Sequence, residues 1–191
     1  MKRGKLLVIC APSGTGKSTL LPLLKERFPE LKESISYTTR DPRQGEIHGK
    51  NYFFCSKEEF LERARQKEFL EYFEVHGNFY GTSRSFVEKE LESGHHLLFD
   101  LDTQGADALK AFFGACCFVI FLAPPSLEDL KMRLEKRGTE SEENKNLRLQ
   151  NAEKELSRQY DYDARIVNSQ LEVALEELSV LVKTILGKTC C

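Results

Sequence analysis

Eight residues near the N-terminus, Ala11–Ser18, have the types and spacing of a phosphate-binding loop. Their sequence is APSGTGKS. Gly14 and Gly16 stand where the backbone must turn its N–H groups inward, and a Cβ would obstruct that turn. The ammonium of Lys17 can reach the outer phosphates of a nucleotide, and the hydroxyl of Ser18 is an oxygen ligand suited to Mg²⁺. The pattern therefore predicts a site for nucleotide phosphates and Mg²⁺.

The position of this loop in the chain supports that interpretation. The apolar run Leu6–Cys10 precedes it, and helical spacing of leucines begins after Thr19. A buried strand, a glycine-bearing loop and a helix, in that order, make a phosphate cradle. The strict pattern begins with glycine where this chain has Ala11, although the looser pattern, with alanine or glycine first, is satisfied. The alternative is an ordinary glycine-rich turn between a strand and a helix.

Further apolar runs predict the rest of the core. They lie at His96–Asp100, Cys116–Leu122 and Ile166–Val167, and helical segments separate them. Strands that alternate with helices form a parallel sheet covered on both faces, which is an α/β fold. Residues 34–94 differ, because they contain short β-branched and aromatic segments joined by dense turns. They predict a small mixed α/β lobe inserted into the core.

Length and charge limit the classes of function. The chain has 191 residues, which suits one compact domain with inserted lobes, and its formal net charge is −2. That charge provides no basic field for a nucleic acid polymer. No apolar segment is long enough to span a bilayer, and the cysteines lack paired metal-ligand spacing. We expect a cytoplasmic protein, a monomer or small homo-oligomer, with neither a membrane nor a nucleic acid partner.

Five further segments carry a family resemblance. They are SISYTTRDPRQGEIHGKNYFF, EYFEVHGNFYGTS, LLFDLDTQG, FLAPPSLEDLKMRLEKRGTES and ARIVN. With the phosphate loop, they resemble the guanylate kinases from about Lys5 to Leu186, in that family's order and spacing. The resemblance implies a three-layer P-loop nucleoside monophosphate kinase fold that transfers the γ-phosphoryl group of ATP to GMP with Mg²⁺. We expect dGMP to be used as well, because no residue singled out here reads the 2′-hydroxyl. Its parts would be a core of residues 1–33, 95–136 and 160–191, a GMP-binding lobe of residues 34–94 and a helical lid of residues 137–159.

The resemblance also implies which residues hold ATP and the metal. The ATP contacts would be Ala11, Pro12, Ser13, Gly14, Thr15, Gly16, Lys17, Ser18, Thr19 and Asn168, with Asn168 near adenine. Ser18 would bind Mg²⁺ directly and Asp100 would bind it through water, since an acidic residue at a strand end completes many phosphate-loop sites. The resemblance assigns Asp100 and Asp102, as a pair, to the monophosphate site and the metal region, without dividing the two roles between them. For Asp102, a helix-capping carboxylate is the alternative.

The expected acceptor site lies in the lobe. A monophosphate dianion needs fixed cationic donors, and arginine suits bidentate contact with phosphate. The resemblance places Arg40 and Arg43, with the hydroxyl groups of Tyr52 and Tyr80, on the phosphate of GMP. A solvated arginine pair beside buried aromatic residues is the alternative.

Guanine presents an N1–H and an exocyclic amine side by side, and one carboxylate can accept a hydrogen bond from each. The resemblance assigns this part to Glu71, with Ser36 donating to O6 of guanine and Thr82 assisting. A site that hydrogen-bonds a substrate group can reject an analogue lacking that group by about 10⁴–10⁵. The alternative for Glu71 is a carboxylate on the surface of a strand.

Three arginines resemble those of the lid that closes over ATP, namely Arg133, Arg137 and Arg148. With Lys17 and Arg40, they are the expected catalytic residues, because phosphoryl transfer depends on positioning and charge neutralisation. A lone arginine on an exposed helix is usually only solvated.

Two other functions remain open. The first is a non-catalytic interaction module, like the kinase-like domains of membrane-associated scaffold proteins. Such modules usually have damaged phosphate loops, whereas this chain keeps Gly16, Lys17 and Ser18. The second is a related kinase acting on another phosphorylated metabolite, such as a ribose bisphosphate. That kinase would have no need of Ser36, Glu71 and Thr82 as a set that reads guanine.

Overall fold

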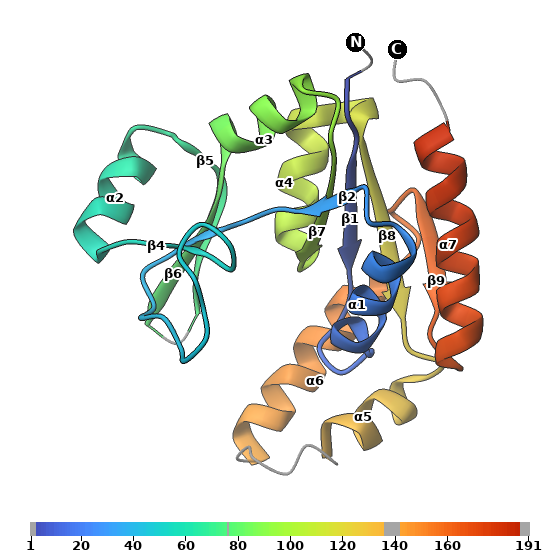
Figure 1. Ribbon diagram of the computed structural model, residues 1–191. Coiled ribbons are helices and arrows are strands. Elements are labelled where there is room, and N and C mark those ends of the chain that lie inside the picture. The colour runs from blue at the N-terminus through green and yellow to red at the C-terminus, as the bar shows by residue number, and fades with distance from the viewer. Residues whose placement is uncertain (1–2, 76, 136–141, 188–191) are drawn as a thin grey trace.

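The computed structural model describes residues 3–75, 77–135 and 142–187 (Figure 1). Its central element is a five-stranded sheet of order β2-β7-β1-β8-β9, in which every neighbouring pair is parallel. The strands are β1 (Leu6–Cys10), β2 (Leu31–Glu33), β7 (His96–Leu101), β8 (Cys117–Ala123) and β9 (Ala164–Val167). Every residue of β1 is fully buried, because this strand lies between β7 and β8. The parallel core sheet expected from the apolar runs is confirmed.

Helices cover both faces of this sheet. Helices α1 (Lys17–Arg27) and α7 (Leu171–Gly187) pack on one face, while α3 (Arg84–Glu92) and α4 (Thr103–Phe113) pack on the other. Alternate residues of β1 serve the two faces, since Leu7 contacts the α1 and α7 side and Val8 the α3 and α4 side. Each buried leucine or valine contributes about 1.5–3 kcal/mol through removal of apolar surface from water. The result is the three-layer α/β fold that the sequence predicts.

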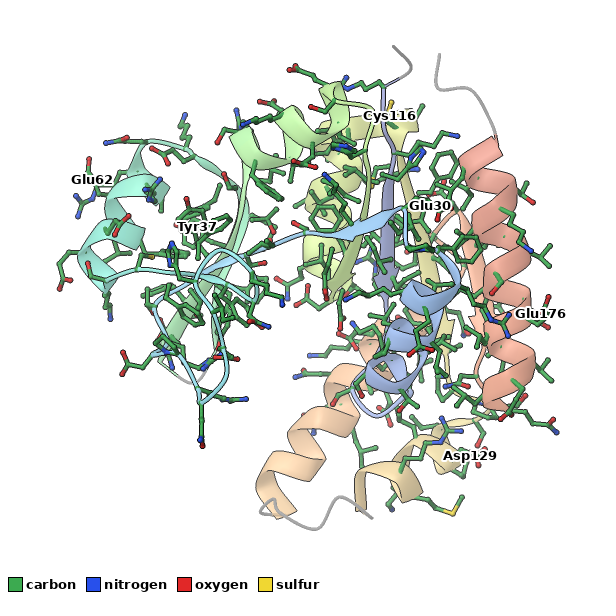
Figure 2. All side chains as sticks on the ribbon, viewed as in Figure 1. Glu30, Tyr37, Glu62, Cys116, Asp129 and Glu176 are labelled. Atoms are coloured by element: carbon green, nitrogen blue, oxygen red, sulfur yellow. The ribbon has the colours of Figure 1, made fainter. Side chains whose placement is uncertain are left out.

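An ion pair joins the two helices of the first face. Arg27 near the end of α1 donates to Glu176 of α7 at 2.7 Å and to Ser179 at 3.1 Å. Figure 2 labels Glu176 on α7. The pair is exposed, so it adds only about 0.2–1 kcal/mol to the packing of the leucines beneath it.

A second sheet stands beside the core sheet (Figure 1). Its strand order is β4-β3-β6-β5, with one parallel pair and two antiparallel pairs. The strands are β3 (Tyr37–Thr38), β4 (Phe53–Phe54), β5 (Phe69–Val75) and β6 (Asn78–Ser83), and α2 (Lys57–Arg65) packs against them. Phe60 of α2 stacks on Phe69 at 4.5 Å between ring centroids. A Cβ on Gly81 would lie 2.9 Å from Phe60, so only glycine fits there.

Two helices continue the chain near the carboxyl ends of the core strands, α5 (Leu127–Glu135) and α6 (Glu142–Ser157). Ser126 caps α5, because its hydroxyl accepts a hydrogen bond from the Asp129 N–H at 3.0 Å. Leu130 and Ala152 are buried together between the two helices. Residues 137–141 of the expected lid lie outside the described residues. None of the described helices has the length and apolar character needed to cross a membrane.

The structure differs from the sequence-based expectation at two places. The β-branched and aromatic residues of segment 34–40 predict one strand there. The observed strand is shorter, because the chain leaves the core sheet after β2 and enters the second sheet at β3. Ser34 N–H still bonds the Leu98 carbonyl of the core sheet, while the Ser36 carbonyl accepts from Phe53 N–H of the second sheet. The sequence predicts a short helix over residues 106–113. Helix α4 begins three residues earlier, at Thr103, because Asp102 caps it.

Candidate active site

The predicted phosphate loop joins β1 to α1. Gly14 and Gly16 both have a φ of 92°, a left-handed conformation that glycine adopts without strain. Gly16 is also the N-cap of α1, so the loop delivers the chain directly into the first helical turn. Within the loop, the Pro12 carbonyl accepts from the Thr15 hydroxyl at 2.8 Å and from the Thr15 N–H at 3.3 Å. The backbone is therefore held in a tight turn at the positive end of the helix dipole, where anions bind.

This loop lines a cavity of about 350 Å³, here called the loop cavity. Its lining residues are Ala11, Pro12, Ser13, Gly14, Thr15, Gly16, Lys17, Ser18, Asp100, Asp102 and Glu155. Ser18 is exposed in the first turn of α1, and Thr19 follows it without lining the cavity. Besides the loop itself, the cavity is therefore lined by one lysine, Lys17, and three carboxyl-bearing residues, Asp100, Asp102 and Glu155.

Lys17 crosses to the carboxyl end of the neighbouring strand β7. Its ammonium donates to the Leu101 carbonyl at 2.7 Å and lies 2.6 Å from Oδ1 of Asp100. The side chain is 18% exposed, whereas that of Asp100 is 47% exposed. The positive charge of Lys17 is therefore balanced by Asp100 in this structure.

Arg133 and Asn168 lie behind the phosphate loop. The Asn168 side-chain amide donates to the Thr15 carbonyl at 2.7 Å, and the side chain is buried. Arg133 donates to the same carbonyl at 3.3 Å and to the Asn168 carbonyl at 3.1 Å. A Cβ on Gly16 would lie 2.6 Å from the Asn168 amide nitrogen. Both side chains therefore support the loop from outside the loop cavity. The catalytic role expected for Arg133 and the adenine contact expected for Asn168 stay predictions.

The other two arginines of the expected lid cannot be placed. Arg137 lies outside the described residues, and Arg148 falls in α6, where its side chain is not described. Their catalytic role stays a prediction.

A second cavity of about 310 Å³ adjoins the first. Its lining residues include Ser34, Ser36, Glu46, Asn51, Tyr52, Asp100 and Leu101, and it is here called the Ser36–Tyr52 cavity. Arg40 lies behind its wall, with its guanidinium 5.5 Å from the centre of the Tyr52 ring. Tyr80 packs edge-on against Tyr52, with 6.0 Å between ring centroids. Burial raises the pKa of Tyr52, which therefore keeps its hydroxyl proton as a hydrogen-bond donor.

The two arginines expected on the acceptor phosphate differ in their surroundings. Arg40 is 15% exposed and forms an ion pair with Glu46. Arg43 has an exposed side chain that is not among the residues lining this cavity, and its backbone N–H donates to Glu46 at 2.8 Å. Glu46, which the sequence analysis did not single out, thus connects the two.

Glu71 lies in a third cavity of about 390 Å³, which Asp102 also lines. The Thr82 hydroxyl donates to Oε1 of Glu71 at 2.5 Å. The other carboxylate oxygen, Oε2, is buried and has no hydrogen-bond partner among the described residues. Burial, opposed by the Thr82 hydrogen bond and assisted by nearby Asp102, raises the pKa of Glu71 to about 7. A buried acceptor without a partner is suited to a ligand that brings hydrogen-bond donors.

Two aspartates at the end of β7 connect these three cavities. Asp100 lines the loop cavity and the Ser36–Tyr52 cavity, and Asp102 lines the loop cavity and the Glu71 cavity. Asp102 also caps α4, because its Oδ1 accepts from the Gly105 N–H at 2.8 Å. The helix-capping alternative for Asp102 is therefore confirmed, and it places the carboxylate at the junction.

The donor set of the loop cavity fits Mg²⁺. The Ser18 hydroxyl and the Asp100 carboxylate are oxygen ligands, which Mg²⁺ prefers. No group of three or more His, Cys, Asp or Glu side chains in the described part of the chain could hold a metal ion by itself. Mg²⁺ is usually bound through one or two carboxylates, waters and the phosphates of a substrate.

Glu155 of α6 is a further residue of the loop cavity that the sequence analysis missed. Burial, together with the negative charge of Asp102 and against the positive charge of Lys17, raises its pKa to about 7. Its position in a polar helix gave no sign of this, because the contact depends on how α6 packs across the loop.

Comparison with known proteins decides the family. A family model described as guanylate kinase matches residues 3–185. The chain belongs to the guanylate kinase family. This assignment accounts for the order of the motifs along the chain as well as for the layered fold around the phosphate loop.

Individual relatives agree over nearly the whole chain. A protein named guanylate kinase from Oleidesulfovibrio alaskensis is 45% identical, covering 99% of this chain and 92% of its own length. One of the same name from Nitratidesulfovibrio vulgaris is 48% identical over 93% of this chain and 85% of its own length. The crystal structure of guanylate kinase from Anaplasma phagocytophilum superposes with a TM-score of 0.73 at 33% identity, covering 100% of this chain and 90% of that one.

Proposed function

We propose that this protein transfers the γ-phosphoryl group of ATP to GMP, giving ADP and GDP, as a member of the guanylate kinase family. One observation carries the proposal. Asp100 is a shared wall of the loop cavity and the Ser36–Tyr52 cavity, and Lys17 contacts it there. Two phosphate groups held in these cavities would meet at a single point, which phosphoryl transfer between them requires.

The loop residues would hold the donor. Backbone N–H groups of residues 13–18 would surround the β- and γ-phosphates of ATP at the start of α1, and Lys17 would exchange its contact with Asp100 for one with these phosphates. Ser18 and Asp100 would hold Mg²⁺, which neutralises charge on the phosphates when bound. Arg133 and Asn168 support this part by fixing the Thr15 carbonyl and with it the loop.

The acceptor needs little chemical activation. A phosphate oxygen of GMP is already a nucleophile, so the protein must chiefly orient it and neutralise charge. Tyr52 and Tyr80 would donate hydroxyl hydrogen bonds to this phosphate, and Arg40 with Arg43 would supply positive charge. Lys17 and the lid arginines Arg133, Arg137 and Arg148 would stabilise the charge on the moving phosphoryl group.

The guanine ring would lie toward the Glu71 cavity. The Oε2 atom of Glu71 would accept from guanine, while Ser36 would donate to O6. The orphan acceptor of Glu71 favours guanine over the sugar phosphates of the metabolite-kinase alternative. The intact phosphate loop and the relatives named guanylate kinase likewise disfavour the interaction-module alternative. We also propose dGMP as an acceptor, since none of the residues assigned here reads the 2′-hydroxyl.

A reducing cytoplasm is the location that we propose. The cysteines among the described residues, Cys10, Cys55, Cys116 and Cys117, are all free thiols. Free thiols agree with a reducing compartment, where ATP and GMP are also available to purine nucleotide metabolism.

A coupled assay of ADP formation with GMP, dGMP, AMP, UMP and CMP as acceptors tests the function. We expect turnover with GMP and dGMP and at least a thousandfold lower kcat/KM with the others, in line with the discrimination of hydrogen-bonding sites. Equal use of GMP and AMP would reject guanine recognition. ATP binding without phosphorylation of any acceptor would favour the interaction module.

A further inference from the structure

Glu46 makes the most complete set of polar contacts beside the proposed acceptor site. Both of its carboxylate oxygens accept from Nη2 of Arg40 at 2.9 Å. Its Oε2 also accepts from the Arg43 N–H at 2.8 Å. The carboxylate lines the Ser36–Tyr52 cavity, yet its side chain is only 20% exposed.

The backbone anchors this carboxylate independently of Arg40. Residues 43–46 form a turn in which the Glu46 N–H donates to the Arg43 carbonyl at 3.0 Å. The Arg43 N–H returns a hydrogen bond to the side chain of Glu46, and this contact, followed by Arg40, lowers the pKa of Glu46. Glu46 is therefore an ionised group at a fixed point of the loop. Since its position does not depend on Arg40, it can set the orientation of the arginine.

The Arg40 guanidinium has further partners besides Glu46, among them the Tyr80 hydroxyl. The group lies 5.5 Å from the Tyr52 ring and 5.9 Å from the Phe54 ring. An aromatic ring attracts a cation to its face, but it does not fix how the guanidinium is rotated above the ring. Nη1 donates to the Asp41 carbonyl at 2.7 Å, and Glu46 holds Nη2. Guanidinium has five N–H donors, so these contacts leave donor capacity for a phosphate.

We propose that Glu46 is a positioning residue for the acceptor phosphate, because its anchored carboxylate holds the Arg40 guanidinium in a phosphate-binding orientation. The proposal rests on the proposed function, which assigns Arg40 to the phosphate of GMP. A side chain held in its binding orientation before the ligand arrives loses less freedom on binding. The negative charge of Glu46 by itself would repel the phosphate, so its benefit must come through Arg40.

Calorimetric titration with GMP and with guanosine tests this, since only GMP carries the phosphate. In Glu46→Gln we expect GMP to bind about tenfold more weakly, the size of one lost charged hydrogen bond, and guanosine to bind as in the unaltered protein. Glu46→Asp keeps the charge but has a shorter side chain. Its affinity for GMP should lie between those of the unaltered protein and Glu46→Gln. In steady-state kinetics, KM for GMP should rise tenfold while KM for ATP stays constant.

Glu62→Gln is the matched control. Glu62 is also a glutamate paired with an arginine, Arg65, at 2.6 Å, but it lies on the outer side of α2 (Figure 2). Its GMP and guanosine affinities should both equal those of the unaltered protein. Thermal melting of each variant shows whether the second sheet is intact, so that a folding defect is separated from a binding defect.

Four outcomes would overturn the proposal. Tighter GMP binding by Glu46→Gln would mean that Glu46 competes with phosphate for Arg40. Equal losses of GMP and guanosine affinity would mean that Glu46 only maintains the lobe, and unchanged affinities would mean that it does nothing for binding. If the unaltered protein bound GMP no better than guanosine, the proposed acceptor site itself would fail, and the role of Glu46 with it.

Discussion

The loop cavity and the cavities beside the second sheet are built in contrasting ways. The loop cavity takes most of its polar groups from consecutive residues, 11–18, and its geometry comes from backbone conformation at two glycines. The acceptor side collects single side chains from β5, β6 and the segments around β3 and β4, which are far apart in sequence. The phosphate loop, which is a local backbone structure, and a dispersed set of acceptor-side side chains therefore meet at the end of β7. Changes on one side should leave the ligand of the other side unaffected.

The largest expected effect is on the loop side. We expect Lys17→Ala to lower kcat for GDP formation by at least about 10²–10³, because a preorganised charge at the moving phosphoryl group is lost. GMP affinity, measured by calorimetry, should stay within twofold, since the ammonium serves the ATP phosphates. A loss of GMP affinity as large as the loss of turnover would contradict the separation of the two sides.

Gly16→Ala tests the backbone conformation of the phosphate loop. The new Cβ would meet the Asn168 amide at 2.6 Å, in a residue whose φ is 92°. We expect KM for ATP to rise at least tenfold and the free energy of unfolding to fall by about 1–2 kcal/mol. GMP affinity should not change.

Gly77→Ala is the matched control for Gly16→Ala. Gly77 has a φ of 79°, but a Cβ there would meet nothing within 4 Å. The Gly77→Ala variant should therefore lose stability through backbone strain alone, and its KM for ATP should stay unchanged. Equal effects of the two substitutions on ATP would show that the Asn168 contact is irrelevant.

Glu71→Gln tests the acceptor side. The amide places a donor against an N–H of guanine, which leaves a desolvated group unpaired at a cost of about 1–3 kcal/mol. Use of GMP should therefore weaken by roughly 10–100-fold, with ATP handling unchanged and AMP used no worse than before. If turnover with GMP and AMP fell by the same factor, Glu71 would be structural and the base would be read elsewhere.

The pH dependence of guanosine binding sharpens the same point. The pKa of Glu71 is raised to about 7, so its carboxyl group is protonated below that pH and ionised above it. Guanine donates to the ionised form, and affinity should therefore fall by up to about tenfold per pH unit below pH 7. Guanosine is the right probe because it has no phosphate that titrates. The dependence should vanish in Glu71→Gln, and its persistence there would assign it to another group.

The smallest expected effect concerns stability. Glu155 has a pKa of about 7 in the folded protein, above the ordinary 4.5, so the folded state holds its proton more tightly than the unfolded state. Its contribution to stability is therefore lost as pH rises from about 4.5 to 7. Glu155→Gln should raise the melting temperature by about 2–4 °C at pH 8 and by less at pH 5. Glu153 is exposed on the same helix, so Glu153→Gln should leave the melting temperature unchanged at both pH values.

Several features could be predicted from the sequence because their causes are local. The phosphate loop needs only its glycines, its lysine and the strand and helix on either side, and these are consecutive. The parallel core follows from short apolar runs separated by helices. The capping box Ser56–Glu59, which predicts the start of α2, is similarly local, since the Ser56 hydroxyl accepts from the Glu59 N–H at 3.0 Å.

The acceptor residues were predicted only through the family resemblance. Nothing in the separate segments containing Glu71 and Thr82 indicates that these residues are in contact, because the pairing of β5 with β6 brings them together. The division into core, lobe and lid stays a prediction for the same reason.

Tertiary structure alone decided the electrostatics of the site. The sequence gives Lys17 and Asp100 their charges, but the pairing of β1 with β7 brings them to 2.6 Å. Burial raised the pKa of Glu71 and of Glu155, and burial depends on every element packed around a group. The sequence by itself determined which groups can bind phosphate and where the backbone must turn. The fold determined which charges face each other and how far water is excluded from them, because both depend on distances between residues remote in the chain.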